Sequence, residues 1–143
     1  MKIVLFALVI LAVIVASAQA ALDGTWKTEW NTTIDLRVDQ AGYLRGQLTV
    51  EHSPNDCAHG TFELFGRIAA SPMNHGLPLA FTVGWINDLS DCAAVSTWSG
   101  QYFPQEQDHP EVIRTTWLRT FTTEHRDSHG ATNVGDDVFF RPH

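Results

Sequence analysis

The sequence predicts an all-β fold, an eight-stranded antiparallel up-and-down β-barrel. Eight short segments alternate polar and apolar residues as strands do, at a spacing of about ten residues. Turn-forming residues separate these segments, and no segment has helical periodicity. Because no long crossover connects the segments, a closed barrel is favoured over a β-sandwich, which is the alternative architecture.

The alternation is clearest in the second segment, where Ile34, Leu36 and Val38 share one face and Asp35 and Arg37 share the other. A glycine, Gly42, follows in a turn that can use its positive φ. The eight expected strands span residues 24–30, 32–39, 43–51, 61–69, 79–87, 94–103, 111–121 and 131–141.

Two neighbouring strands at the centre of the chain each carry a tryptophan. Trp85 lies in the run Thr82-Val83-Gly84-Trp85, and Trp98 follows a short polar loop and sits among Ser and Thr residues. Tryptophans on paired strands beside small hydroxyl residues suit the wall of a ligand pocket. The alternative is that both simply fill a β core, as aromatic residues often do.

The first twenty residues predict a secretory signal peptide. A positive start at Lys2 precedes an apolar run over residues 3–15, and small residues end in Ala20, where we expect cleavage. The run is shorter than the ~20 apolar residues that a membrane span needs. We therefore expect a secreted, extracellular protein with no membrane partner.

Residues 21–143 form one expected domain of 123 residues, which is long enough to bury a core. Without Lys2 the chain has eight Lys and Arg against sixteen Asp and Glu, a formal charge of -8. An acidic surface without a basic cluster argues against nucleic acid and anionic lipid as partners.

The two cysteines, Cys57 and Cys92, both lie in expected loops. In a secreted protein such a pair usually forms one disulfide, and two free thiols are the alternative. Asn31 begins the N-glycosylation sequon Asn31-Thr32-Thr33. The seven histidines show no spacing that would hold a metal, and no nucleophilic triad stands out, so we expect neither a metal site nor an enzyme.

Five blocks of sequence, in order and spacing, resemble the avidins and streptavidin, and the resemblance covers nearly all of residues 21–143. The blocks are Gly24-Thr25-Trp26, Thr82-Val83-Gly84-Trp85, Ser96-Thr97-Trp98-Ser99-Gly100-Gln101-Tyr102, Thr116-Trp117-Leu118 and Ala131-Thr132-Asn133-Val134-Gly135-Asp136-Asp137-Val138-Phe139.

This resemblance implies a barrel that binds biotin non-covalently at one open end, with no catalytic activity and no cofactor. Trp85, Trp98 and Trp117 match the family's wall tryptophans, and Asp137 matches the carboxylate that accepts a ureido N–H. The implied ligand set is Thr28, Thr32, Trp85, Ser96, Trp98, Trp117 and Asp137. Trp26 also matches, and we interpret it as core.

Four positions depart from the family pattern. Leu48 stands where a tyrosine usually donates to the ureido oxygen, and Thr28 stands where an asparagine does so. Ala94 replaces a serine that often holds the biotin carboxylate, and Arg119 replaces an apolar residue. A missing donor to a buried carbonyl costs ~1–3 kcal/mol. Arg119 could bind a ligand carboxylate or could partly fill the pocket, and a glycan at Asn31 would lie near its mouth.

The resemblance also bears on assembly. His129 stands about where tetrameric avidins carry a tryptophan that caps the neighbouring site, whereas Cys57 and Cys92 fall in loops that are linked in dimeric avidins such as rhizavidin. We therefore expect a homodimer, with a homotetramer as second choice. Biotin sequestration or defence is the expected role. The alternatives are a carrier of another small apolar ligand, with weak or no biotin binding, and a disulfide-linked interaction module.

Overall fold

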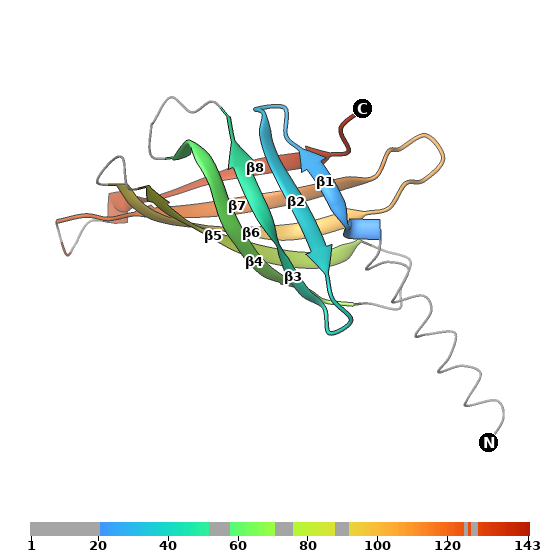
Figure 1. Ribbon diagram of the computed structural model, residues 1–143, viewed down its shortest axis with the longest axis horizontal. Helices are drawn as coiled ribbons and strands as arrows, with labels where there is room; N and C mark the ends of the chain where they lie inside the picture. The colour runs from blue at the N-terminus through green and yellow to red at the C-terminus, as the bar shows by residue number, and fades with distance from the viewer. Residues whose placement is uncertain (1–20, 52–57, 71–75, 88–91, 125, 127–128) are drawn as a thin grey trace, which may run out of the picture.

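The computed structural model describes residues 21–51, 58–70, 76–87, 92–124, 126 and 129–143, with the backbone alone at Asn87, Cys92 and His129. The described residues form a closed antiparallel barrel in which the eight strands follow chain order, so that β8 returns to β1 (Figure 1). The predicted all-β barrel is confirmed, and the sandwich is excluded by the closure.

The strand bounds agree with the prediction to within two residues, except at β1, which ends at Lys27 instead of Trp30. The strands are β1 (Gly24–Lys27), β2 (Thr32–Val38), β3 (Tyr43–Val50), β4 (Gly60–Ile68), β5 (Leu77–Asn87), β6 (Cys92–Phe103), β7 (Val112–Phe121) and β8 (Thr132–Phe140), and a 3-10 helix, η2 (His129–Ala131), precedes β8. In the described part of the chain no helix is long and apolar enough to cross a bilayer.

A tight turn explains why β1 is short. The backbone N–H of Thr28 donates to the carbonyl oxygen of Thr32 at 2.9 Å, and the N–H of Asn31 donates to the carbonyl of Thr28. Asn31 has a φ of 62°, a conformation that asparagine tolerates better than most residues. The chain therefore reverses over residues 28–32, where the alternation had predicted three more strand residues.

The β2–β3 turn forms as predicted around Gly42, whose φ is 82°. The Asp39 carboxylate accepts the backbone N–H groups of Ala41 and Tyr43, each at 2.9 Å. This local capping satisfies the turn's donors and fixes the register of the hairpin, in which Val38 pairs with Leu44.

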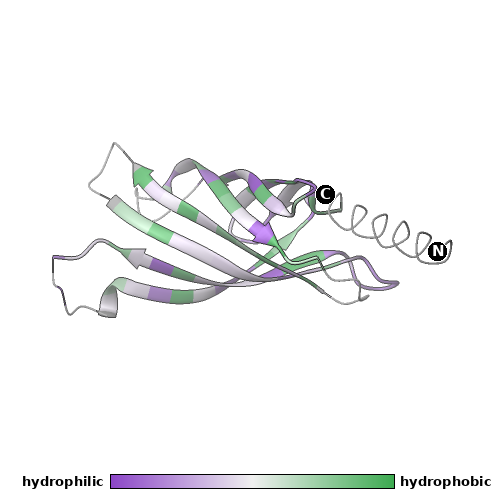
Figure 2. Cartoon of the chain, turned by 90° about the horizontal axis from the view of Figure 1, so that it is seen from below, coloured by the Kyte–Doolittle hydropathy of each residue, from purple (hydrophilic) through white to green (hydrophobic). Residues whose placement is uncertain are grey.

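The two ends of the barrel differ in how their inward side chains are covered. At the end that holds the β2–β3, β4–β5 and β6–β7 connections, here called the closed end, the inward residues include the fully buried Trp26, Leu36, Ile113 and Phe139. At the opposite end, here called the open end, some inward residues are buried, such as Trp85, and others are half-buried, such as Trp117. Along the strands, residues of high and low hydropathy follow one another (Figure 2).

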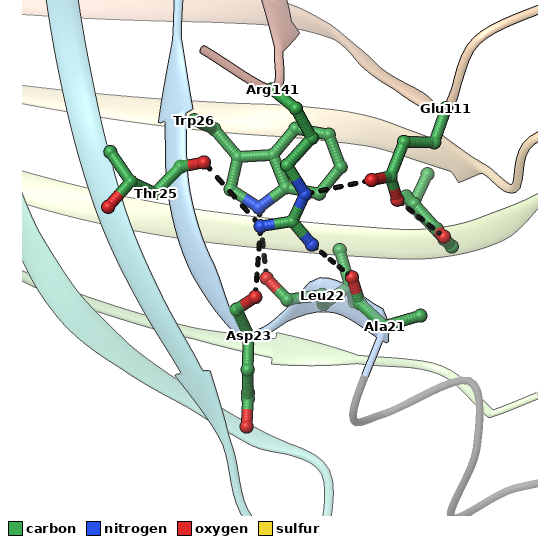
Figure 3. A network of polar contacts seen from close by, with 8 residues as sticks. Ala21, Leu22, Asp23, Thr25, Trp26, Glu111 and Arg141 are labelled. Carbon is green, nitrogen blue, oxygen red and sulfur yellow. Dashed lines mark hydrogen bonds and ion pairs between the residues drawn. The ribbon is translucent and has the colours of Figure 1, made fainter. Parts of the chain in front are cut away.

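A side-chain network at the closed end reinforces the seam between β8 and β1, where the register contains one pair, Lys27 with Phe140. The guanidinium of Arg141 lies 3.9 Å from the centre of the Trp26 ring, and its Nε donates to Glu111 at 2.9 Å (Figure 3). Its Nη atoms donate to the carbonyl oxygens of Ala21 and Asp23. Trp26, predicted as core, is fully buried.

Candidate ligand-binding site

Four consecutive strands bring five of the seven predicted ligand residues to one inner wall. Trp85 lies on β5, Ser96 and Trp98 on β6, Trp117 on β7 and Asp137 on β8. Trp98 pairs directly with Trp117 across β6 and β7, and the ring centroids of Trp85 and Trp98 are 6.2 Å apart. Because side chains alternate between the two faces of a strand, all five point into the barrel.

A glycine on the neighbouring strand makes room for Trp117. Trp117 pairs with Gly135 on β8, and a Cβ atom at Gly135 would lie 2.3 Å from the indole ring. Any larger residue at this position would therefore displace the tryptophan from the wall.

Ser96 is the polar centre of the wall. Its Oγ accepts a hydrogen bond from Trp85 Nε1 at 2.6 Å and another from Arg119 Nε at 2.9 Å. A serine hydroxyl has two acceptor lone pairs and one proton, so these two donors use its acceptor capacity. Ser96 is 0% exposed, because the side chains around it, Arg119 among them, cover it.

Arg119 lies against two of the predicted wall residues. Its Cζ is 4.8 Å from the centre of the Trp85 ring and 5.4 Å from that of the Trp117 ring. Both distances are within the range of cation–π attraction. The sequence left open whether Arg119 would bind a ligand group or partly fill the site; here its guanidinium lies within the predicted site and leaves Trp85 only 2% exposed.

Asp137 is held in place by the wall itself. Its Oδ2 accepts the Trp98 indole N–H at 2.8 Å, and its backbone carbonyl accepts the Thr115 hydroxyl at 3.1 Å. Burial raises the pKa of this carboxyl, and the hydrogen bond from Trp98, the charge of Arg119 and a weaker contribution from the Trp117 indole partly oppose the rise. Because a carboxylate has about four lone-pair sites, Asp137 keeps the capacity to accept a ligand N–H as well.

Arg119 and Asp137 influence each other without touching. Burial lowers the pKa of the Arg119 guanidinium, and the negative charge of Asp137 opposes that shift. Within the described residues the ion pair shorter than 4 Å is Arg141 with Glu111, at the other end of the barrel. The open half therefore holds a cation and an anion on the same inner wall, and among the described residues each keeps hydrogen-bonding capacity.

The remaining predicted donors, Thr28 and Thr32, lie at the β1–β2 turn. The hydroxyl of Thr28 accepts the Thr32 backbone N–H at 3.2 Å and donates to the Thr32 carbonyl at 3.4 Å. It is thus committed to the turn, whereas the Thr32 side chain is half-buried and makes no hydrogen bond within the described residues. Leu48, on the adjacent β3, is fully buried and has no donor to offer.

Two phenylalanines that sequence reasoning did not assign to the site complete its aromatic lining. Phe62 packs edge-on against Trp85 with ring centroids 4.9 Å apart, and Phe81 stacks on Trp98 at 5.0 Å. Their inward position follows from the alternation of β4 and β5, but alternation does not show which inward residues meet across strands.

Several predicted features lie outside the described residues. Cys57 is outside them, as is the side chain of Cys92, so the disulfide stays a prediction. The backbone of His129 belongs to η2, but its side chain is also outside the description. Asn31 is described, and its side chain is exposed in the β1–β2 turn, which is where a glycan could be attached.

A comparison with protein-family models matches residues 16–142 to the avidin family. The chain belongs to the avidin family. Avidins are ligand-binding proteins without catalytic activity; they bind biotin and typically assemble into oligomers. The match agrees with the eight-stranded closed barrel.

The contacts of Arg119 affect the energetics of ligand binding. A ring that stacked on the same faces of Trp85 and Trp117 would displace the guanidinium from its hydrogen bond with Ser96 and from the indoles. Hydrogen bonds to charged groups are worth about 1.5–3 kcal/mol, and a cation–π contact adds about 0.5–2 kcal/mol. This displacement opposes ligand binding unless the ligand itself offers Arg119 a new partner.

Proposed function

We propose that this protein binds biotin non-covalently in the open half of its barrel. One observation carries the proposal: Asp137, positioned by Trp98, stands beside three inward tryptophans in a barrel of the avidin family. The indole rings supply apolar walls for a fused bicycle, and Asp137 supplies an acceptor for a ureido N–H.

The proposed affinity is lower than that of an avidin with a full set of polar partners. Leu48 offers no donor, and the Thr28 hydroxyl is committed to the backbone of Thr32. Each unmade hydrogen bond to a buried carbonyl costs about 1–3 kcal/mol, which corresponds to roughly one to two orders of magnitude in the dissociation constant.

Calorimetric titration of residues 21–143 with biotin under non-reducing conditions tests the proposal. We expect saturable heat with one site per chain, and retention on immobilised biotin that free biotin competes away. Trp98→Ala should abolish the heat, because it removes a wall residue and the hydrogen bond that positions Asp137. An absence of heat with the unsubstituted protein would refute biotin binding.

A second candidate ligand is another small, largely apolar molecule carried in the same barrel. Leu48 and Val50, both buried on β3, make this part of the interior apolar, and Arg119 adds a charge. A ligand screen that follows tryptophan fluorescence would identify such a molecule by quenching of Trp85 and Trp117. A protein without any quenching ligand would instead fit an interaction module.

We further propose that the protein is secreted after removal of residues 1–20 and that it sequesters biotin, as a reserve or in defence. The expected Cys57–Cys92 disulfide and a glycan at the exposed Asn31 accompany secretion. Mass spectrometry of the secreted protein tests all three features. We expect an N-terminus at Ala21, a mass lower by two hydrogens than the reduced form, and a sugar that peptide N-glycosidase removes.

A further inference from the structure

Arg119 has hydrogen-bonding capacity that no protein group uses in the described part of the chain. A guanidinium carries five N–H groups, and four of them belong to the two Nη atoms. Its Nε donates to Ser96 at 2.9 Å, whereas within the described residues neither Nη atom donates to a protein acceptor. The side chain is half-buried, so that water reaches it only in part.

Protein contacts hold the planar guanidinium group of Arg119 in place before a ligand binds. The hydrogen bond to Ser96 fixes Nε, and the rings of Trp85 and Trp117 lie 4.8 and 5.4 Å from Cζ. A group that is positioned before the ligand arrives loses little conformational entropy on binding. A planar guanidinium fork matches a carboxylate with two parallel hydrogen bonds.

The surroundings define which part of a ligand meets Arg119. Asp137, which faces the same interior, repels an anion but accepts N–H groups. The inward residues next to Arg119 toward the mouth, Phe121 and its β6 partner Ala94, offer no side-chain donor. A ligand that is an N–H donor at one point and an anion at another is therefore oriented with its N–H toward Asp137 and its anion toward Arg119.

We propose that Arg119 recognises the anionic group of the ligand and makes this site selective for cyclic ureas and amides that carry a carboxylate, over their neutral forms. The ureido part of this assignment rests on the proposed function, whereas the role of Arg119 does not require the ligand to be biotin. The site thereby gains an anion contact that Ala94, which pairs with Phe121, cannot provide.

Two matched pairs of compounds test the selectivity: biotin with biotin amide, and 2-oxoimidazolidine-4-carboxylate with its carboxamide. Dissociation constants are measured by calorimetry for the unsubstituted protein, Arg119→Leu, Arg119→Lys and Arg114→Leu. Arg114 is an exposed arginine on the outward face of the same strand, so its substitution controls for the loss of one positive charge.

In the unsubstituted protein we expect each acid that binds to be preferred over its amide by about tenfold or more, because the hydrogen bonds are charge-assisted. The preference should shrink when salt is raised from about 0.05 to about 0.5 M. Arg119→Leu should remove the preference by weakening the acid and strengthening the amide, Arg119→Lys should keep part of it, and Arg114→Leu should leave it unchanged.

The possible outcomes distinguish the role of Arg119 from biotin binding. Biotin and its amide bound equally would overturn the role of Arg119 and leave the proposed function intact. Binding of the short acid without biotin would overturn the proposed function and support Arg119. No binding of any compound would overturn both. Far-ultraviolet circular dichroism and thermal melting check that Arg119→Leu is folded, and a preference that survives in the folded variant would also overturn the inference.

Discussion

Leu48 lies on β3 between Ile34 of β2 and Phe62 of β4, and it is fully buried on the inner face. An aromatic residue at this position would extend further toward the site, and a phenol would add a donor. The contribution of one hydroxyl donor to biotin affinity can therefore be measured by replacing Leu48 with residues that have or lack a hydroxyl.

We expect Leu48→Tyr to bind biotin about tenfold more tightly than Leu48→Phe, because the two rings are alike and only the tyrosine can donate to a ureido oxygen. The comparison with phenylalanine cancels the cost of fitting a larger ring into the packed interior. Calorimetry on both variants and on the unsubstituted protein provides the dissociation constants. Equal affinities for the two variants would mean that no ligand carbonyl lies within reach of this position.

Asp137 provides a second prediction, which concerns stability and pH. Burial raises its pKa above the ordinary value of 3.8. Below that ordinary value both the folded and unfolded states hold the proton, whereas above the folded pKa the buried charge lowers the free energy of unfolding. An asparagine in place of Asp137 would stay neutral and would keep an oxygen that accepts the Trp98 N–H.

We therefore expect Asp137→Asn to be more stable than the unsubstituted protein at pH 7, and the difference to vanish as the pH falls below about 3.8. Denaturant unfolding at a series of pH values measures it. A variant that is less stable at pH 7, or a difference that does not depend on pH, would show that Asp137 is not held in an unfavourable charged state.

At the scale of elements, the pairing of β1 with β8 depends more on side-chain contacts than on backbone hydrogen bonds between the two strands. The seam between β1 and β8 has one register pair, and Arg141 follows β8 directly. Its Nη atoms donate to backbone carbonyls of residues 21–25, while Glu111 binds its Nε and also accepts the Tyr102 hydroxyl at 3.1 Å. Burial, with further help from Glu111, raises the pKa of Tyr102 to about 12, so that its hydroxyl stays a donor at neutral pH.

We expect Arg141→Ala to lower the free energy of unfolding by about 2–3 kcal/mol, because it leaves carbonyl groups and Glu111 without their charged donor. Arg141→Lys should lower the free energy of unfolding by less than Arg141→Ala, since an ammonium group keeps the charge but cannot reproduce the planar guanidinium. Arg114→Ala, at an exposed position, should change stability by no more than about 0.5 kcal/mol. Urea unfolding measures all three, and equal losses for Arg141→Ala and Arg114→Ala would contradict the role of the network.

The elements themselves were largely predictable, because alternation is a local signal. It located all eight strands, and Gly42 marked a turn that needs a positive φ. The end of β1 was not predictable, since the bonds of Thr28 to Thr32 replace the expected ladder. The contact of Arg119 with Ser96 and the network of Arg141 depend on pairing between strands, and Arg141 lies 120 residues from Ala21 in the sequence. No local pattern indicates such partners.

At the scale of the whole molecule, the Arg141 network that stabilises the barrel and the candidate binding site lie at opposite ends. The Arg141 network lies at the closed end beside the fully buried Trp26, whereas the open end holds the charges of Arg119 and Asp137 beside wall residues that are buried or half-buried. A closed sheet has no free edges, so further association has to use the outer faces of its strands.

The outer faces of β6, β7 and β8 carry an apolar stripe made of Val95, Leu118 and Val134, which are 52%, 52% and 67% exposed. Leu118 pairs directly with Val134, and Val95 lies on the strand next to Leu118. Contiguous exposed apolar residues of this kind indicate a protein interface. The stripe supports the homodimer that the family resemblance led us to expect, and we propose that two copies bury it face to face.

We expect light scattering to give the mass of a dimer for residues 21–143, and Leu118→Asp to give that of a monomer, because a buried unpaired carboxylate at the centre of the stripe is costly. Phe65→Asp is the matched control: Phe65 is similarly exposed, at 49%, but lies on the outer face of β4. It should leave the mass unchanged. A monomeric or tetrameric unsubstituted protein would refute the dimer, and a dimer that Phe65→Asp disrupts while Leu118→Asp does not would move the interface to β4.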